Sequence, residues 1–148
     1  MSIVIGTSYV WNIMAATAMG LQAAAFSSCA SHQRARLDLP YNAEADSRAT
    51  EKLSDEENVE FMRYQKVHQV HTEYLPLAQS SVLLAGLFYP KLSAYAGLGY
   101  IVGRLVYSVA YIRCGADGRK YGAALVGPSI ATMLGASLYG CFKALSIV

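Results

Sequence analysis

The sequence predicts an all-α membrane protein, a single domain built as a four-transmembrane-helix bundle. Of the 148 residues, 54% are hydrophobic and only 15% are charged, against about 25% charged in ordinary soluble domains. Apolar runs recur four times along the chain, and most ionisable residues fall between them. A charged side chain inside such a run is costly unless it has a partner or a function. The few that occur there are therefore candidate site residues.

The first apolar segment runs from about residue 3 to residue 30 and is interrupted only by uncharged polar side chains such as Asn12 and Gln22. It is long enough to cross a bilayer. No positively charged region precedes it, as a secretory signal would require, although the small residues Ser27 to Ser31 resemble a cleavage site. We therefore expect a retained helix, with a removed signal peptide as the lesser alternative.

A polar stretch of both charge signs follows, and we predict an aqueous loop over residues 31–54. Loops of this length are usually functional or disordered. Ser54 and Glu57 have the Ser-x-x-Glu spacing of a capping box, which marks the amino end of a helix. The second helix is therefore predicted over residues 55–89.

Only the stretch from Tyr74 to Tyr89 is apolar enough for hydrocarbon, so the first turns of the second helix should project into the headgroups or beyond. Pro76 is predicted to kink this helix and Pro90 to end it. Four side chains at the polar end are spaced to share one helical face: Lys66, Val70, Glu73 and Tyr74.

The third and fourth helices are predicted over residues 92–114 and 121–145. The third carries three side chains at the spacing i, i+3 and i+7, hence on one face: Arg104, Tyr107 and Tyr111. The glycines Gly97, Gly99 and Gly103 of the same helix are best explained by packing. The fourth has a small-xxx-small pattern that suits close helix packing: Gly127, Ala131 and Gly135.

Four spans would put both termini on one side of the membrane. The loops after the first and third helices hold most of the basic residues, whereas the opposite side offers mainly Lys91 and Lys143. The positive-inside rule then places both basic loops, and the polar end of the second helix, in the cytosol. The basic loop residues are Arg34, Arg36, Arg48, Lys52, Arg113, Arg119 and Lys120.

Several classes of function are excluded or disfavoured. A net charge of +2 with scattered basic residues does not suit a nucleic-acid surface. His68, His71 and Glu73 lack a further ligand at a convincing spacing, so no metal site is predicted. Three cysteines without a Cys-x-x-Cys spacing indicate neither a disulfide framework nor a zinc site. We expect them to be small buried hydrophobic residues: Cys29, Cys114 and Cys141.

Two stretches carry a resemblance to a known family: Phe61 to Pro76, and IVGRLVYSVAY from Ile101 to Tyr111. Together they read Phe-x4-(Arg/Lys)-x-His-x4-Glu followed by Gly-Arg-x-x-Tyr-x3-Tyr. This pattern resembles the membrane-associated proteins in eicosanoid and glutathione metabolism, the MAPEG family, and within it is most similar to the type-3 microsomal glutathione transferases. The resemblance covers nearly the whole chain.

The resemblance implies a homotrimer that binds glutathione, as cosubstrate, between neighbouring subunits near the cytosolic face. By position in the motif, Glu73 would accept the ammonium group of the tripeptide. Arg119, with Lys120 one residue away, is the best match for the arginine that activates the sulfur. The resemblance assigns the remaining contacts, to the carboxylates and to hydrogen-bonding groups, to Lys66, His68, Tyr74, Arg104, Tyr107 and Tyr111.

The residue types suit this chemistry. A free thiol has a pKa of about 8.5, so a nearby guanidinium raises the thiolate population at neutral pH. The electrophile, an apolar compound or a lipid hydroperoxide, would arrive from the bilayer, so the activity would be that of a transferase or a peroxidase. The expected location is a multi-pass protein of the endoplasmic reticulum or a mitochondrial membrane.

Three positions depart from the family pattern: Val70 replaces an asparagine, Lys66 an arginine, and His32 a common arginine. A non-catalytic accessory or scaffold subunit of a larger membrane assembly is therefore an alternative, and a lipid-binding or regulatory protein is another. Structural explanations compete at single residues too. Glu73 could form an interhelical ion pair with Arg104 or Lys66, the tyrosines could be an interfacial belt, and Arg119 and Lys120 could be topology signals.

Overall fold

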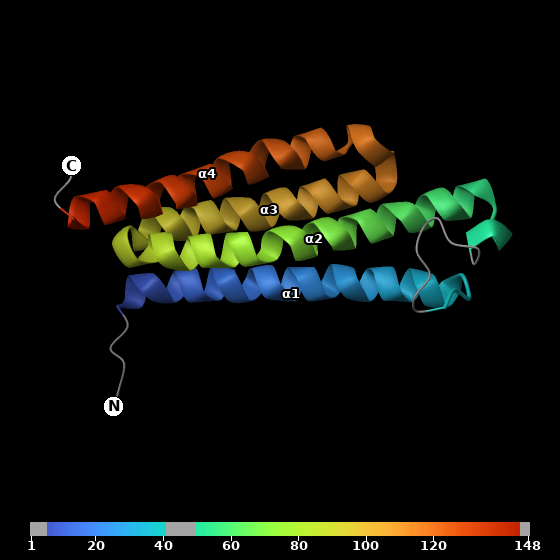
Figure 1. The fold of residues 1–148 in the computed structure, drawn as a ribbon, viewed down its shortest axis with the longest axis horizontal. Helices are drawn as coiled ribbons and strands as arrows, with labels where there is room; N and C mark the ends of the chain where they lie inside the picture. Colours follow the sequence, from blue (N-terminus) through green and yellow to red (C-terminus); the bar gives the residue numbers. More distant parts are fainter. Residues whose placement is uncertain (1–5, 41–49, 146–148) are drawn as a thin grey trace, which may run out of the picture.

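The computed structural model describes residues 6–40 and 50–145, and these residues are almost entirely helical (Figure 1). The predicted all-α class is confirmed for this part of the chain. Two short 3-10 helices lie between the long helices, η1 at Thr50–Lys52 and η2 at Gly115–Asp117. The four long helices are α1 Thr7–Arg36, α2 Asp55–Phe88, α3 Pro90–Cys114 and α4 Arg119–Ala144.

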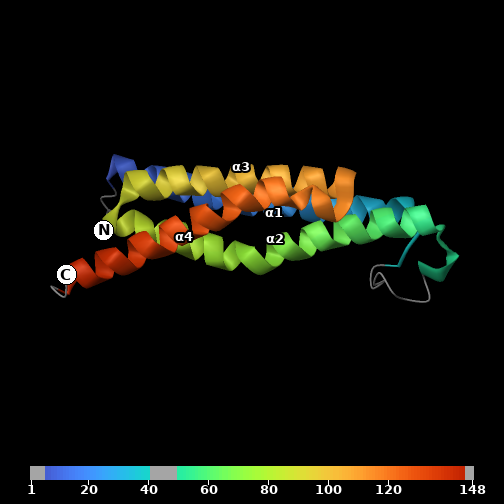
Figure 2. The ribbon, with the colours of Figure 1, turned by 90° about the horizontal axis from the view of Figure 1, so that it is seen from above.

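The helices run up and down along one common axis. Single-residue or short connections join α2 to α3 and α3 to α4, so these neighbours are antiparallel. In Figure 1, α2 and α3 lie between α1 and α4, and the start of α1 and the end of α4 lie at the same end of the bundle. Figure 2 shows α2 bending in its middle part, where Pro76 lies inside the helix and does not end it.

The end of α1 and the start of α2 extend beyond the turn between α3 and α4 (Figure 1). Gln33 Nε2 donates to Glu60 Oε1 at 3.1 Å, and Arg36 Nη1 lies 3.6 Å from the same carboxylate oxygen. These contacts hold the two projecting helix ends together. The prediction that the first turns of α2 reach past the apolar part of the bundle agrees with this arrangement.

The predicted end of the first helix at residue 30 is wrong, because α1 continues to Arg36. His32 and Arg34 are therefore helical and not part of a loop. The apolar run does end near residue 30, but the helix continues past it. Basic residues are favourable at the carboxyl end of a helix, and Glu60 of α2 bonds to Gln33 and Arg36. Residues 41–49 of the predicted loop, and Arg48 among them, lie outside the described residues.

The first helix begins at Thr7, four residues after its predicted start, and the limits of the other three helices differ from the predictions by two residues or fewer. The second helix begins at Asp55, as predicted, and α3 begins at Pro90 because proline is well suited to the first position of a helix. The predicted capping box is present: Glu57 N donates to Ser54 Oγ, and Ser54 N donates to Glu57 Oε2 at 3.0 Å. The hydrogen bonds that Ser54 N and Ser54 Oγ donate to Glu57 Oε2 lower the pKa of the Glu57 carboxyl below its ordinary value of 4.5.

Replacing Ser54 by alanine is expected to fray the first turn of α2, at a cost of about 1 kcal/mol of local stability. Amide hydrogen exchange of the first α2 peptide should measure this, with Ser80→Ala as the control in the interior of the same helix. The pKa of Glu57 is lowered in the folded protein. The ionised Glu57 carboxylate therefore stabilises the fold fully at a pH above its ordinary pKa of 4.5, and this stabilisation is lost as the pH falls through the lowered pKa. Exchange that is unchanged in Ser54→Ala would contradict the cap.

Amide side chains join the helices across the bundle. Asn12 Nδ2 donates to the carbonyl of Pro90 at 3.0 Å, Gln22 Nε2 to that of Ile101 at 3.0 Å, and Gln79 Nε2 to that of Ala16 at 2.9 Å. In an apolar bundle such hydrogen bonds replace the hydrophobic driving force that holds soluble helices together. The polar interruptions of the first apolar segment thus fix α1 against α3.

Glycines allow α3 to lie close to the other three helices. A Cβ added at Gly97 would meet Val82 and Ala15, and one at Gly103 would meet Leu125 and Val126, so their predicted role in packing is confirmed. The prediction for Gly127 and Gly135 is wrong within this chain, because a Cβ at either position meets nothing within 4 Å. On α4 the helix contacts use another face, the one that carries Gly122 and Gly140, and Gly118 at the N-cap is also in close contact.

The outer surface of the bundle is apolar. Large side chains such as Leu21, Leu87 and Leu138 are more than half exposed. The predicted burial of the three cysteines is wrong, since all of them are exposed on the single chain. Among the described residues, α1 and α4 are each long and apolar enough to cross a bilayer. In such helices an apolar residue can face lipid, so hydrophobic character does not require burial in the protein.

Candidate functional site

Arg104 lies in the interior of the bundle, enclosed by tyrosine rings from α2 and α3. It is 3% exposed. Its Nε donates to the Tyr100 hydroxyl at 3.2 Å. The guanidinium carbon lies 4.5 Å from the ring centroid of Tyr74, 5.4 Å from that of Tyr100 and 5.6 Å from that of Tyr107. We call Arg104 with these three tyrosines the arginine cage.

The cage contains no negative charge. The ion pairs that join two described residues are Arg36 with Glu60 and Lys120 with Asp117, and neither involves Arg104. The alternative that Glu73 forms an ion pair with Arg104 or Lys66 is therefore wrong in the described part of the chain. Cation–π contacts compensate part of the lost hydration, but buried charges are normally paired. The arginine cage therefore holds a buried positive charge that no described carboxylate neutralises.

The backbone at Arg104 is held by a link between α3 and α2. Ser108 Oγ donates to the Arg104 carbonyl at 2.8 Å, and His71 Nε2 lies 2.9 Å from the same hydroxyl oxygen. Since the single hydroxyl proton of Ser108 is used toward Arg104, His71 must donate through Nε2. The His71 ring stacks on Phe26 of α1, with centroids 4.7 Å apart. Three helices thus meet beside the cage.

Outside the cage, α2 carries an exposed polar strip of three hydrogen-bonded side chains. Lys66 Nζ donates to Gln69 Oε1 at 3.1 Å, and Gln69 Nε2 donates to Glu73 Oε1 at 2.8 Å. All three residues are exposed. The strip therefore presents an ammonium, an amide and a carboxylate on a surface that the rest of this chain leaves uncovered.

Tyr74 connects the polar strip to the arginine cage. It follows Glu73 directly, it is 42% exposed, and its ring covers the Arg104 guanidinium. Val70, predicted on the same face, is half-buried, whereas His68 is half-buried with an Nδ1 atom that is buried and has no hydrogen-bond partner among the described residues. An elongated ligand with charges at both ends could thus contact the strip and the cage together.

Tyr107 and Tyr111 lie along α3 as predicted, with parallel rings 6.0 Å apart. Arg119 is at the first position of α4 and is exposed, next to Gly118, which packs on Ala110. Since α3 continues for ten residues after Arg104, Arg104 itself lies about 15 Å from that turn along the helix. Among the described residues, no hydrogen bond or ion pair joins Arg119 to the arginine cage.

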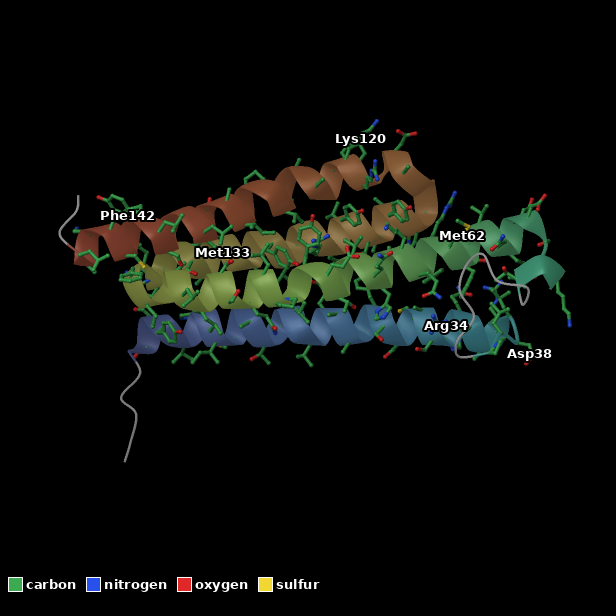
Figure 3. All side chains as sticks on the ribbon, viewed as in Figure 1. Arg34, Asp38, Met62, Lys120, Met133 and Phe142 are labelled. Carbon is green, nitrogen blue, oxygen red and sulfur yellow. The ribbon has the colours of Figure 1, made fainter. Side chains whose placement is uncertain are left out.

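Lys120, the second candidate for the sulfur-activating cation, is engaged elsewhere. Its Nζ donates to Asp117 Oδ1 at 2.9 Å, and it points away from the bundle at the α3–α4 turn (Figure 3). Arg119 makes no hydrogen bond or ion pair with the described residues. Of these two residues, Arg119 is therefore the one whose positive charge is not already paired with a described acid.

Four residues of the site were missed in the sequence. Tyr100 and Ser108 stand four residues before and after Arg104, so the helical period could have found both. Gln69 stands midway between Lys66 and Glu73 on one helix face, where the same rule applies. No comparable pattern in the sequence points to Arg63. Its Nη1 donates to the carbonyl of Ile112 at 3.2 Å and so holds the carboxyl end of α3.

The described residues hold no group of three potential metal-ligating side chains.

The comparison with protein families bears on this geometry directly. The model of the MAPEG family matches residues 7–139. This chain belongs to the MAPEG family. The match covers the polar strip, the arginine cage and Arg119, and the family includes glutathione transferases and eicosanoid synthases. The comparison with individually curated proteins finds no match.

Membership of the MAPEG family agrees with the composition of the helices. A membrane-associated family and two helices apolar enough to cross a bilayer indicate a membrane protein in contact with lipid. The other two long helices, α2 and α3, are not among those apolar enough to cross a bilayer by this measure. The first half of α2 is polar, and α3 carries Arg104 among its tyrosines and glycines, so the polar strip and the arginine cage lie on these two helices.

Proposed function

We propose that this MAPEG protein is a membrane glutathione transferase or glutathione-dependent peroxidase of the type-3 microsomal branch. The observation that supports it best is the joining of the exposed polar strip to the buried arginine cage through Tyr74. Glutathione carries an ammonium and two carboxylates at separate points along an extended tripeptide. The strip and the cage offer matching charges at separate points.

The fit rests on charged groups that form no ion pair with the described residues. Glu73 would receive the ammonium group, and Lys66 with His68 would contact one carboxylate, where the buried His68 Nδ1 still lacks a hydrogen bond. Arg104 would attract the second negative charge, because it is buried without a carboxylate of its own. Tyr74, Tyr107 and Tyr111 would donate hydroxyl hydrogen bonds around it.

Arg119 would stabilise the thiolate. In a homotrimer the cage of one subunit would be completed by an arginine of another, which fits the exposure of Arg119 and of the polar strip on the single chain. The thiolate sulfur would bond to the carbon of an apolar electrophile and expel its leaving group. With a lipid hydroperoxide, two glutathiones would be oxidised to the disulfide as the peroxide is reduced to an alcohol and water.

The membrane arrangement follows the same proposal. All four helices would span the bilayer, with the projecting ends of α1 and α2 and the α3–α4 turn in the cytosol. That orientation brings a water-soluble thiol to the end of the bundle while the electrophile arrives from the lipid. Proximity of the two reactants would then supply much of the acceleration. The membrane would be that of the endoplasmic reticulum or the mitochondrion.

Equilibrium binding of glutathione to the purified protein tests the proposal. Glu73→Gln is expected to weaken binding about 10- to 100-fold, because it removes a charge-assisted hydrogen bond to the ammonium group. Glu56→Gln, an exposed acid in the first turn of the same helix, is the matched control and should bind like the parent. An ultraviolet difference spectrum should show a thiolate that Arg119→Ala loses. No saturable binding at millimolar glutathione would sink the proposal.

A second candidate is a non-catalytic accessory or scaffold subunit of a larger membrane assembly. Two observations favour it: Lys66, Gln69 and Glu73 already bond to each other, and Val70 presents no amide. For such a subunit, gentle detergent should yield a stable heteromer, whereas the enzyme should yield a homotrimer. Mass measurement of the purified complex distinguishes the two.

A further inference from the structure

We propose that a groove between α1 and α3, at the end of the bundle away from the projecting ends of α1 and α2, binds an anionic phospholipid. The groove has a volume of about 610 Å³ and extends along α1 from Thr7 to Ala18. That length is about 16 Å, close to half of the roughly 30 Å hydrocarbon thickness of a bilayer. It therefore suits an acyl chain of one leaflet. The site is separate from the proposed glutathione site.

Small residues make the groove hollow. Ala15 and Ala18 of α1 face Ala94 of α3 across it, so the two helices leave a gap that larger side chains would fill. Trp11 and Tyr95 stand on its sides and are 60% and 76% exposed. Aromatic side chains of this kind are enriched where hydrocarbon meets headgroups. The walls of the groove are thus apolar toward the middle of the bundle and amphipathic near the end of the bundle.

Lys91 gives the mouth of the groove a positive charge. It is exposed, lies in the first turn of α3, and makes no ion pair with the described residues. A cation at the amino end of a helix is unfavourably placed relative to the helix dipole, and a bound anion would relieve that repulsion. The hydroxyls of Thr7 and Ser8 line the same mouth. An ammonium and two hydroxyl donors suit a phosphate headgroup.

Charge also argues against a second copy of the chain as the occupant. Every Asp and Glu lies between residues 38 and 73 except Asp117, which is at the α3–α4 turn. In a ring of parallel copies, the described acids of a neighbour would lie from the middle of α2 to the opposite end of the bundle. None of these described acids would then reach Lys91. An anionic lipid of the adjacent leaflet supplies the missing charge and an acyl chain together.

The test uses the full-length protein in nanodiscs, titrated with phosphatidylglycerol and with phosphatidylcholine of the same acyl chains. Native mass spectrometry counts the lipid that stays bound. The parent protein should prefer phosphatidylglycerol, and Lys91→Gln should lower its affinity about five-fold and abolish the preference. Lys143→Gln, a lysine near the same end but outside the groove, should behave like the parent. Equal affinity of Lys91→Gln and the parent overturns the proposal.

Filling the groove gives an independent test. Ala94→Trp should lose both lipids while keeping the oligomeric mass of the parent. If it retains bound phosphatidylglycerol, the proposal is wrong. A change in oligomeric mass also overturns it, because the groove would then be an interface between copies. Should Ala94→Trp fail to fold, the exposed Lys91→Gln variant decides alone.

Discussion

Replacement of Gly122 by alanine is expected to disrupt the pairing of α3 and α4 and to cost about 3 kcal/mol of stability. A Cβ at this position would fall on the backbone and Cβ atoms of Tyr107, and no flexible side chain can move aside. The helices would have to separate at the level where Tyr107 contacts Arg104. Because α4 also packs on α2, the disturbance should spread to the arginine cage.

Gly127→Ala is the matched control for this variant. It lies on the same helix, but its Cβ would meet nothing within 4 Å. Alanine is a better helix former than glycine by up to about 1 kcal/mol, so this control should be neutral or stabilising. Thermal unfolding in detergent, followed by circular dichroism, measures both. Equal Tm values for the two variants would show that the α3–α4 approach is looser than described.

Replacement of Arg104 by methionine should separate binding from stability. The guanidinium is buried without a carboxylate, so an apolar side chain of similar length removes a desolvation penalty. We expect the Tm to stay the same or rise. Glutathione affinity should fall about 100-fold, because the bound anion loses its charged hydrogen-bond donor. Residues kept for function at the expense of stability behave in this way.

Arg104→Lys gives the intermediate case. It keeps the positive charge but loses the planar fork and the stacking on Tyr74 and Tyr107. We therefore expect affinity between those of the parent and Arg104→Met, measured by the same equilibrium titration. If Arg104→Met unfolds and Arg104→Lys does not, the arginine serves mainly to hold the tyrosines, and the cage is structural.

The sequence alone determined the helices and part of the site. Apolar length and the Ser54–Glu57 capping box define four helices, since both depend on residues close in the chain. The spacing of Arg104, Tyr107 and Tyr111 places them on one face for the same reason. Local periodicity could have added Tyr100 and Ser108. These are properties of single helices, which hydrophobic pattern and a 3.6-residue period specify.

The tertiary structure decided which faces meet. Glu60 of α2 prolongs α1 to Arg36, the ring of Tyr74 closes over Arg104, and His71 reaches Ser108 on another helix. The tertiary structure also determines that α4 approaches α3 closely at Gly122 and not at Gly127. Such choices depend on how each helix is rotated about its own axis. In a membrane protein both inward and outward faces are apolar, so the hydrophobic pattern that reveals the helices does not say which way they turn.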